Sequence, residues 1–154
     1  MRDFNDTDRK KKSTRIRIPE NPGNLSPEII TQLEGTVKAA LKDGYLSCPI
    51  AWKIARNANV PKIAVGAIAD KLGVRVTNCQ VGCFAVEKTP YDKSVHQNID
   101  GEIITILDTL KENKQLTCHK IFELAQQFKL TPMVIADEAN IRGLKISSCQ
   151  LGCF

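Results

Sequence analysis

Histidine, aromatic residues and glycine-rich loops are scarce in this sequence. Its 154 residues include two histidines, His96 and His119, and 5% aromatic residues. Histidine is the commonest general base in enzymes, and nucleotide-binding enzymes use a glycine-rich phosphate loop, which the sequence lacks. These absences leave few candidates for general-base or nucleotide chemistry, and the sequence predicts a protein that is not an enzyme.

Long apolar runs are also missing. No uncharged apolar stretch approaches the roughly 18 residues that a membrane helix needs. The first residues, Met1 to Asp6, include acids and no apolar segment such as a signal peptide contains. We therefore expect a cytoplasmic protein without a membrane partner. The length fits one medium domain or two very small ones.

Six cysteines stand out against this background. In a cytoplasmic chain of this length, such a number favours metal or redox chemistry over a framework of disulfides. Thiol chemistry is therefore the first functional expectation.

The chain contains one sequence unit twice. A shift of 70 residues without a gap superimposes all six cysteines in pairs. The tail NCQVGCF, residues 78–84, meets SCQLGCF, residues 148–154. Separated positions would not agree in this way by chance, so the sequence predicts two repeats with the same fold. The cysteine pairs are Cys48 with Cys118, Cys79 with Cys149, and Cys83 with Cys153.

Four segments follow from this alignment, namely an N-terminal arm (1–25), a first repeat (26–84), a linker (85–98) and a second repeat (99–154). Residues 1–20 hold seven basic and four acidic side chains. Residues 35–84 carry a net charge of +5, whereas residues 101–154 carry a net charge of 0. An acidic partner such as DNA would therefore meet the arm and the first repeat.

Each repeat has the pattern helix, short strand, helix, turn, helix, strand. In the first repeat, Ser26 and Pro27 mark the start of the first helix. The second helix begins at Cys48, a tight turn lies near Asn59, and alternating residues after the third helix predict a strand. The second repeat follows the same order from about Asp100.

This order and its apolar skeleton resemble the winged-helix and helix-turn-helix families. Such units place alanine in the second helix, as at Ala55 and Ala125, and apolar residues on both sides of the turn. Glu138 departs from that template. The resemblance implies a mainly α fold with short β-strands, built as two tandem winged-helix or helix-turn-helix-like repeats.

In such folds the exposed face of the third helix enters the major groove of DNA. Few of the residues on this face can read bases. The face consists of Lys62, Ile63, Gly66 and Ala67 in the first repeat, and of Pro132, Met133, Ala136 and Asp137 in the second. We therefore expect contacts mainly to phosphates. The alternative for the arm is a solvated, solubilising tail. The predicted nucleic-acid-binding residues are Arg9, Lys10, Lys11, Lys12, Arg15, Arg17, Lys53, Arg56 and Lys62.

The cysteines of each repeat have the spacing Cys-x30-Cys-x3-Cys. A helix start favours the thiolate form of Cys48 and Cys118. Three thiolates suit soft metals, so an iron-sulfur cluster and zinc are the expected cofactors. The predicted three-thiolate metal sites are Cys48, Cys79 and Cys83 in the first repeat, and Cys118, Cys149 and Cys153 in the second.

Two alternatives to a metal site are open. A dithiol switch would join the last two cysteines of each repeat, if a turn brings their Cα atoms within roughly 7 Å. Cysteines also pack in cores as small hydrophobes. His119 beside Cys118 is a candidate fourth ligand that the first repeat lacks, since Pro49 takes that place there.

The ending Cys-Gln-x-Gly-Cys-Phe resembles that of small uncharacterised proteins of anaerobic prokaryotes, which implies an iron-sulfur or redox setting. The sequence therefore predicts a metal- or redox-responsive DNA-binding regulator with a three-cysteine site in each repeat. The alternative is an iron-sulfur or metal-binding accessory or electron-transfer module that contacts an anaerobic metalloenzyme.

Overall fold

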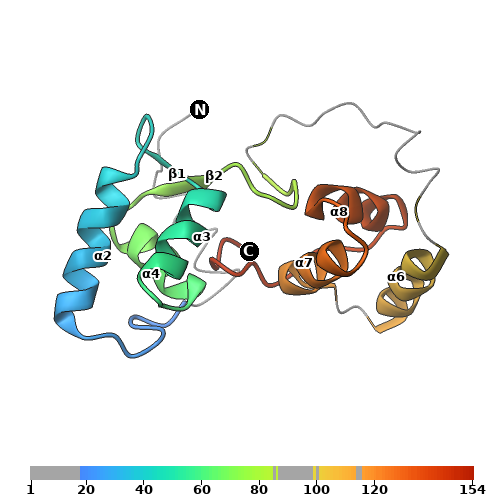
Figure 1. Cartoon of the computed structure of the whole chain (residues 1–154), viewed down its shortest axis with the longest axis horizontal. Helices are drawn as coiled ribbons and strands as arrows, with labels where there is room; N and C mark the ends of the chain where they lie inside the picture. The colour runs from blue at the N-terminus through green and yellow to red at the C-terminus, as the bar shows by residue number, and fades with distance from the viewer. Residues whose placement is uncertain (1–17, 85, 87–98, 100, 114–115) are drawn as a thin grey trace. The chain divides into compact units, whose positions relative to one another are not determined.

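The chain folds as two compact units (Figure 1). The computed structural model describes residues 18–84, 86, 99, 101–113 and 116–154. Unit 1 comprises Met1–Cys79 together with Gln150–Phe154, and unit 2 comprises Gln80–Cys149. The end of each repeat therefore belongs to the unit that the other repeat builds.

Unit 1 contains helices around a short parallel strand pair. Helix α2 (Pro27–Ala39) begins after Ser26, whose side chain accepts a hydrogen bond from the Ile29 amide at 3.4 Å. Strand β1 (Tyr45–Ser47), α3 (Cys48–Asn57), α4 (Lys62–Lys71) and strand β2 (Arg75–Thr77) follow. In the pair, Ser47 lies opposite Thr77. The strands therefore bring the start of α3 to the end of β2.

Unit 2 has the same order of helices, with a single parallel bridge in place of the strand pair. Its helices are α6 (Gly101–Asn113), α7 (Cys118–Gln127) and α8 (Pro132–Ile141). Thr117 and Ser147 form a parallel bridge at the positions that match Ser47 and Thr77. Asn59 and Lys129, with φ of 52° and 54°, occupy matching places in the turn between the second and third helices. The two units thus share one order of helices, as the sequence duplication predicts.

Matched apolar positions fill both cores. Each first helix buries two apolar residues one turn apart, and the segment before the second helix and the second and third helices contribute further buried residues. Removing these side chains from water is the main stabilising contribution in domains of this size. The matched core residues include Leu33, Val37, Leu46 and Val65 in unit 1, and Ile103, Leu107, Leu116 and Ile135 in unit 2.

The expected mainly α fold with short strands is confirmed. In residues 72–84 and 142–154, all of which the structure describes, a turn takes the place of a wing hairpin. Strand β2 pairs with β1 in parallel. The chain bends beyond this point at Gly82, and at the matching Gly152 of the second repeat, with φ of 73° and 74°. Within the described part, every helix is too short or too polar to cross a membrane.

Glu138, which departs from the helix-turn-helix template, forms an ion pair in the structure. Glu138 is 7% exposed, and Arg142 Nη1 lies 2.8 Å from its Oε1. Arg142 Nε lies 3.7 Å from Asp108 Oδ1 on α6. The matching positions in unit 1 are Ile68 and Leu72. An ion pair on α8 thus replaces an apolar pair on α4.

Exchanging this ion pair for the residues of unit 1 tests its contribution. Arg142→Leu alone should lower the free energy of unfolding by about 2 kcal/mol, because a nearly buried carboxylate loses its counter-charge. Adding Glu138→Ile should bring stability back to within about 1 kcal/mol of the wild type, or above it. Urea unfolding followed by far-UV circular dichroism measures both changes. An unchanged midpoint in the single variant would show that the pair contributes no stability.

Candidate functional site

Two cysteines meet at one edge of the strand pair in unit 1. Cys48 is the first residue of α3 and is 7% exposed, and Cys79 lies two residues beyond β2 and is 4% exposed. Because Ser47 and Thr77 face each other, both cysteines follow the carboxyl ends of adjacent strands. Neighbouring strands lie about 4.8 Å apart, so this edge holds the two thiol-bearing residues close together.

Unit 2 repeats this arrangement. Cys118 begins α7, and its amide donates a hydrogen bond to the Ser147 carbonyl at 3.0 Å. Cys149 follows two residues after Ser147. Cys118 is 5% exposed, and Cys149 is half-buried. We refer to Cys48 with Cys79, and Cys118 with Cys149, as the thiol pairs.

The third cysteine of each repeat belongs to the other unit. Cys83 lies in unit 2 and Cys153 in unit 1. Among the described residues, no three histidine, cysteine, aspartate or glutamate side chains form a group able to hold a metal ion. The third cysteine of each predicted site is thus assigned to the other unit, and the three-thiolate sites stay a prediction. The thiol pairs supply part of a soft-metal ligand set, and the metal itself stays a prediction.

The end of the second repeat packs on α4 (Figure 1). We refer to Gln150–Phe154 as the C-terminal segment. A Cβ atom at Gly66 would lie 2.7 Å from the carbonyl carbon of Leu151, and one at Gly152 would lie 2.9 Å from Ile63 Cδ1. Leu151 is 1% exposed. Glycine at position 66 therefore lets the backbone of the segment lie directly on the helix.

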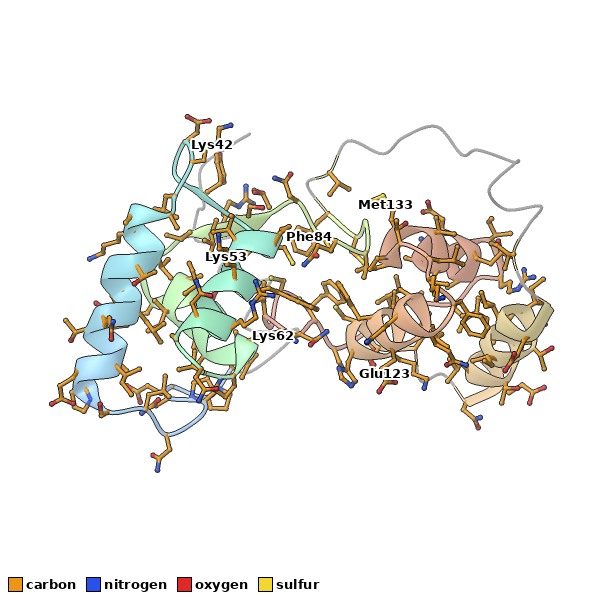
Figure 2. The ribbon with its side chains drawn as sticks, in the orientation of Figure 1. Lys42, Lys53, Lys62, Phe84, Glu123 and Met133 are labelled. Carbon is orange, nitrogen blue, oxygen red and sulfur yellow. The ribbon has the colours of Figure 1, made fainter. Side chains whose placement is uncertain are left out.

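Lys62 joins the C-terminal segment to unit 1 (Figure 2). Its ammonium group donates a hydrogen bond to Gln150 Oε1 at 2.8 Å and lies 3.9 Å from the ring centroid of Trp52. A cation above an indole face is a favourable electrostatic contact. Lys62, Ile63 and Gly66 belong to the face of α4 that the sequence predicts to meet DNA, and the C-terminal segment covers that face.

Lys53 and Arg56 are exposed on α3, and their counterparts on α7 are Glu123 and Gln126. Figure 2 shows the side chain of Lys53. A hydrogen bond from Lys120 at 3.1 Å lowers the pKa of Glu123. His119 Nε2 lies 3.2 Å from the same carboxylate, so the candidate fourth metal ligand faces Glu123. Positive charge is therefore concentrated on the second helix of unit 1 and not on that of unit 2.

The basic residues of the arm lie outside the described residues. They remain predicted phosphate contacts from the sequence alone. These residues are Arg9, Lys10, Lys11, Lys12, Arg15 and Arg17.

A groove of about 390 Å³ between α2 and α3 was not expected from the sequence. Ile29 and Ile50 are 37% and 39% exposed at its rim. The sequence signal for this groove is a difference in side-chain size between the repeats. Three lining positions of unit 1 have small side chains, and the aligned positions of unit 2 have larger ones. These positions are Thr36, Ala40 and Ala58, matched by Ile106, Leu110 and Phe128.

Each thiol pair combines nucleophilic sulfur with the start of a helix. The positive end of the helix dipole favours negative charge at such a position, which suits metal ligation or reaction with an oxidant. None of the six cysteines is in a disulfide in the structure. No protein-family model, curated protein or solved structure matches this chain.

Thiol labelling tests the burial of the thiol pairs. In native protein, N-ethylmaleimide should modify Cys83 first, because it is exposed, and Cys48, Cys79 and Cys118 at rates at least about tenfold lower. Tandem mass spectrometry assigns the adduct to each cysteine. In urea, all six should react at similar rates. Equal rates in the native protein would contradict the buried edge.

Proposed function

We propose that the chain is a metal- or redox-responsive DNA-binding regulator built from two helix-turn-helix-like repeats. The helices α3 and α4, separated by the turn at Asn59, have the order of such a unit. The observation that carries the proposal is the location of Cys48 and Cys118 at the first positions of α3 and α7. Chemistry at these sulfurs acts directly on the helix pair, because the helix begins at the reacting residue.

The proposed effector is a soft metal ion or an iron-sulfur cluster bound through thiolates. Zinc takes four ligands, so each thiol pair supplies half of such a set and the other ligands come from elsewhere. Oxidation is the alternative signal. In that case Cys48 and Cys79 form an S–S bond and pass two electrons and two protons to a small-molecule disulfide, which leaves as two thiols.

DNA is the proposed partner because of the charge distribution. Residues 35–84 carry +5, and Lys53 and Arg56 are exposed on α3. Exposed lysine and arginine attract phosphates and release counterions, which gives binding without base recognition. The scarcity of base-reading groups on α4 favours phosphate contacts as the main source of affinity.

An iron-sulfur or metal-binding accessory module is the second candidate. The observation that favours it is the C-terminal segment over Lys62, Ile63 and Gly66 of α4. A third helix covered in this way does not enter a DNA groove unless the segment moves. An accessory module would use its exposed surfaces for a metalloenzyme instead.

Metal binding is tested on protein purified without oxygen. We expect either a brown colour from an iron-sulfur cluster or, after addition of Co²⁺, the charge-transfer absorption of thiolate-bound cobalt. Cys48→Ser and Cys118→Ser should each remove about half of that absorption, because each unit has one thiol pair. His119→Ala is the control and should retain it. A colourless protein without cobalt-thiolate absorption would rule out the metal form of the proposal and leave the oxidation form.

DNA binding is tested by its salt dependence. Duplex DNA affinity should fall steeply with rising salt, and replacing Lys10, Lys11 and Lys12 by alanine should flatten the slope by about three phosphate contacts or fewer. Alanine at Lys111 and Lys114 of the second repeat should change the slope little, because residues 101–154 have no net charge. Fluorescence anisotropy with a labelled duplex measures the affinity. No binding at low salt, with or without metal, would favour the accessory module.

A further inference from the structure

We infer that the Cys-Gln-x-Gly-Cys-Phe segments are exchanged between the repeats, and that the C-terminal segment is a lid on the outer face of α4. The occupant of that face is thus a defined part of this chain. The repeat pattern in the sequence does not reveal this interaction surface. Its consequence for DNA binding rests on the proposed function, whereas the docking itself does not.

Three independent contacts fix the lid on α4. The Leu151 backbone lies where a side chain at position 66 would be, Gly152 packs on Ile63, and Gln150 accepts a hydrogen bond from Lys62. Gly152 also packs on Ile18, which precedes α2. Leu151 and Gly152 are buried. The lid is therefore part of the folded core of unit 1.

The other segment has a corresponding place in unit 2. Val81 is 2% exposed within that unit, and Ala136, the counterpart of Gly66, is fully buried. Leu151 has one methylene more than Val81, and Ala136 has one carbon more than Gly66. Exchange therefore pairs the larger lid residue with the smaller helix residue in unit 1, and the smaller lid residue with the larger helix residue in unit 2. Docking within the same repeat would pair small with small and large with large, which close-packed contacts tolerate poorly.

The lid controls the face of α4 that a helix-turn-helix protein uses. Lys62 and Gly66 lie under it, so DNA reaches them after the lid has moved. Cys153 lies on the lid and is half-buried, whereas Cys83, its counterpart, is exposed. A thiol on the lid gives metal or redox chemistry a direct way to shift the lid equilibrium.

Gly66→Ala is the variant that releases the lid. Alanine has a higher helix propensity than glycine, so the substitution stabilises the helix α4 itself. The new Cβ atom, however, overlaps the Leu151 backbone. Reaction of Cys153 with N-ethylmaleimide should become about tenfold faster or more, with the rate at Cys83 unchanged. Emission of Trp52, the single tryptophan, should shift as well, because Lys62 and its hydrogen-bonded Gln150 lie beside the ring.

Gly35→Ala is the matched control, since a Cβ at Gly35 of α2 meets no atom within 4 Å among the described residues. It should leave both cysteine rates unchanged. If Gly66→Ala does not fold by circular dichroism, Lys62→Met replaces it, because it removes the hydrogen bond to Gln150 and keeps the aliphatic stem. If the labelling rate of Cys83 rises and that of Cys153 does not, the inferred exchange of segments between the repeats is overturned. Unchanged rates at both cysteines would overturn the lid.

Duplex DNA affinity of Gly66→Ala separates the lid from the proposed function. Tighter binding than in the wild type supports the lid as a regulator of α4. Faster labelling of Cys153 with no DNA binding in either protein leaves the lid established and removes the DNA-binding function. Faster labelling with equal DNA affinity in both proteins shows that α4 is not the DNA-contacting face, which overturns the regulatory consequence.

Discussion

The close approach of the Leu151 backbone to Gly66 is the constraint on which the rest of unit 1 depends. A helix normally presents a layer of side chains to whatever packs on it, and here one position has none. The C-terminal segment enters that gap, and Gln150 comes within hydrogen-bond distance of Lys62. Lys62 in turn is directed to the Trp52 ring rather than to solvent. The absence of a side chain at Gly66 thus allows the C-terminal segment to pack on α4, where Gln150 contacts Lys62 beside Trp52.

The parallel pairing of β1 and β2 has a similar effect on the cysteines. Two strands that run in the same direction bring their carboxyl ends to one edge, and Cys48 and Cys79 follow those ends. The helix α3 begins at the same edge, so the positive end of its dipole lies there. Unit 2 reaches the same arrangement with a single parallel bridge between Thr117 and Ser147. The pairing, rather than cysteine spacing, defines the candidate site.

The two units differ in charge and in side-chain size at matched positions. Unit 1 has basic residues exposed on α3, and an apolar pair at Ile68 and Leu72. Unit 2 has the ion pair of Glu138 and Arg142 in place of that apolar pair. Large side chains in unit 2 replace the small ones that leave the groove between α2 and α3 in unit 1. The common core therefore carries two different exteriors, and the proposed contacts to an acidic partner fall on unit 1.

The sequence by itself determined the duplication, the order of helices and strands, and the turn at Asn59 and Lys129. Those features are local or periodic, since caps, apolar spacing and left-handed turn residues act over a few positions. It also placed cysteines at the starts of α3 and α7. Only the tertiary structure decided that β1 and β2 pair in parallel, and that Cys83 and Cys153 belong to the opposite units. A shift of 70 residues aligns the repeats equally well whether each tail packs on its own repeat or on the other. The choice depends on long-range packing at Gly66 and Leu151, because a Cβ at residue 66 would overlap the Leu151 backbone.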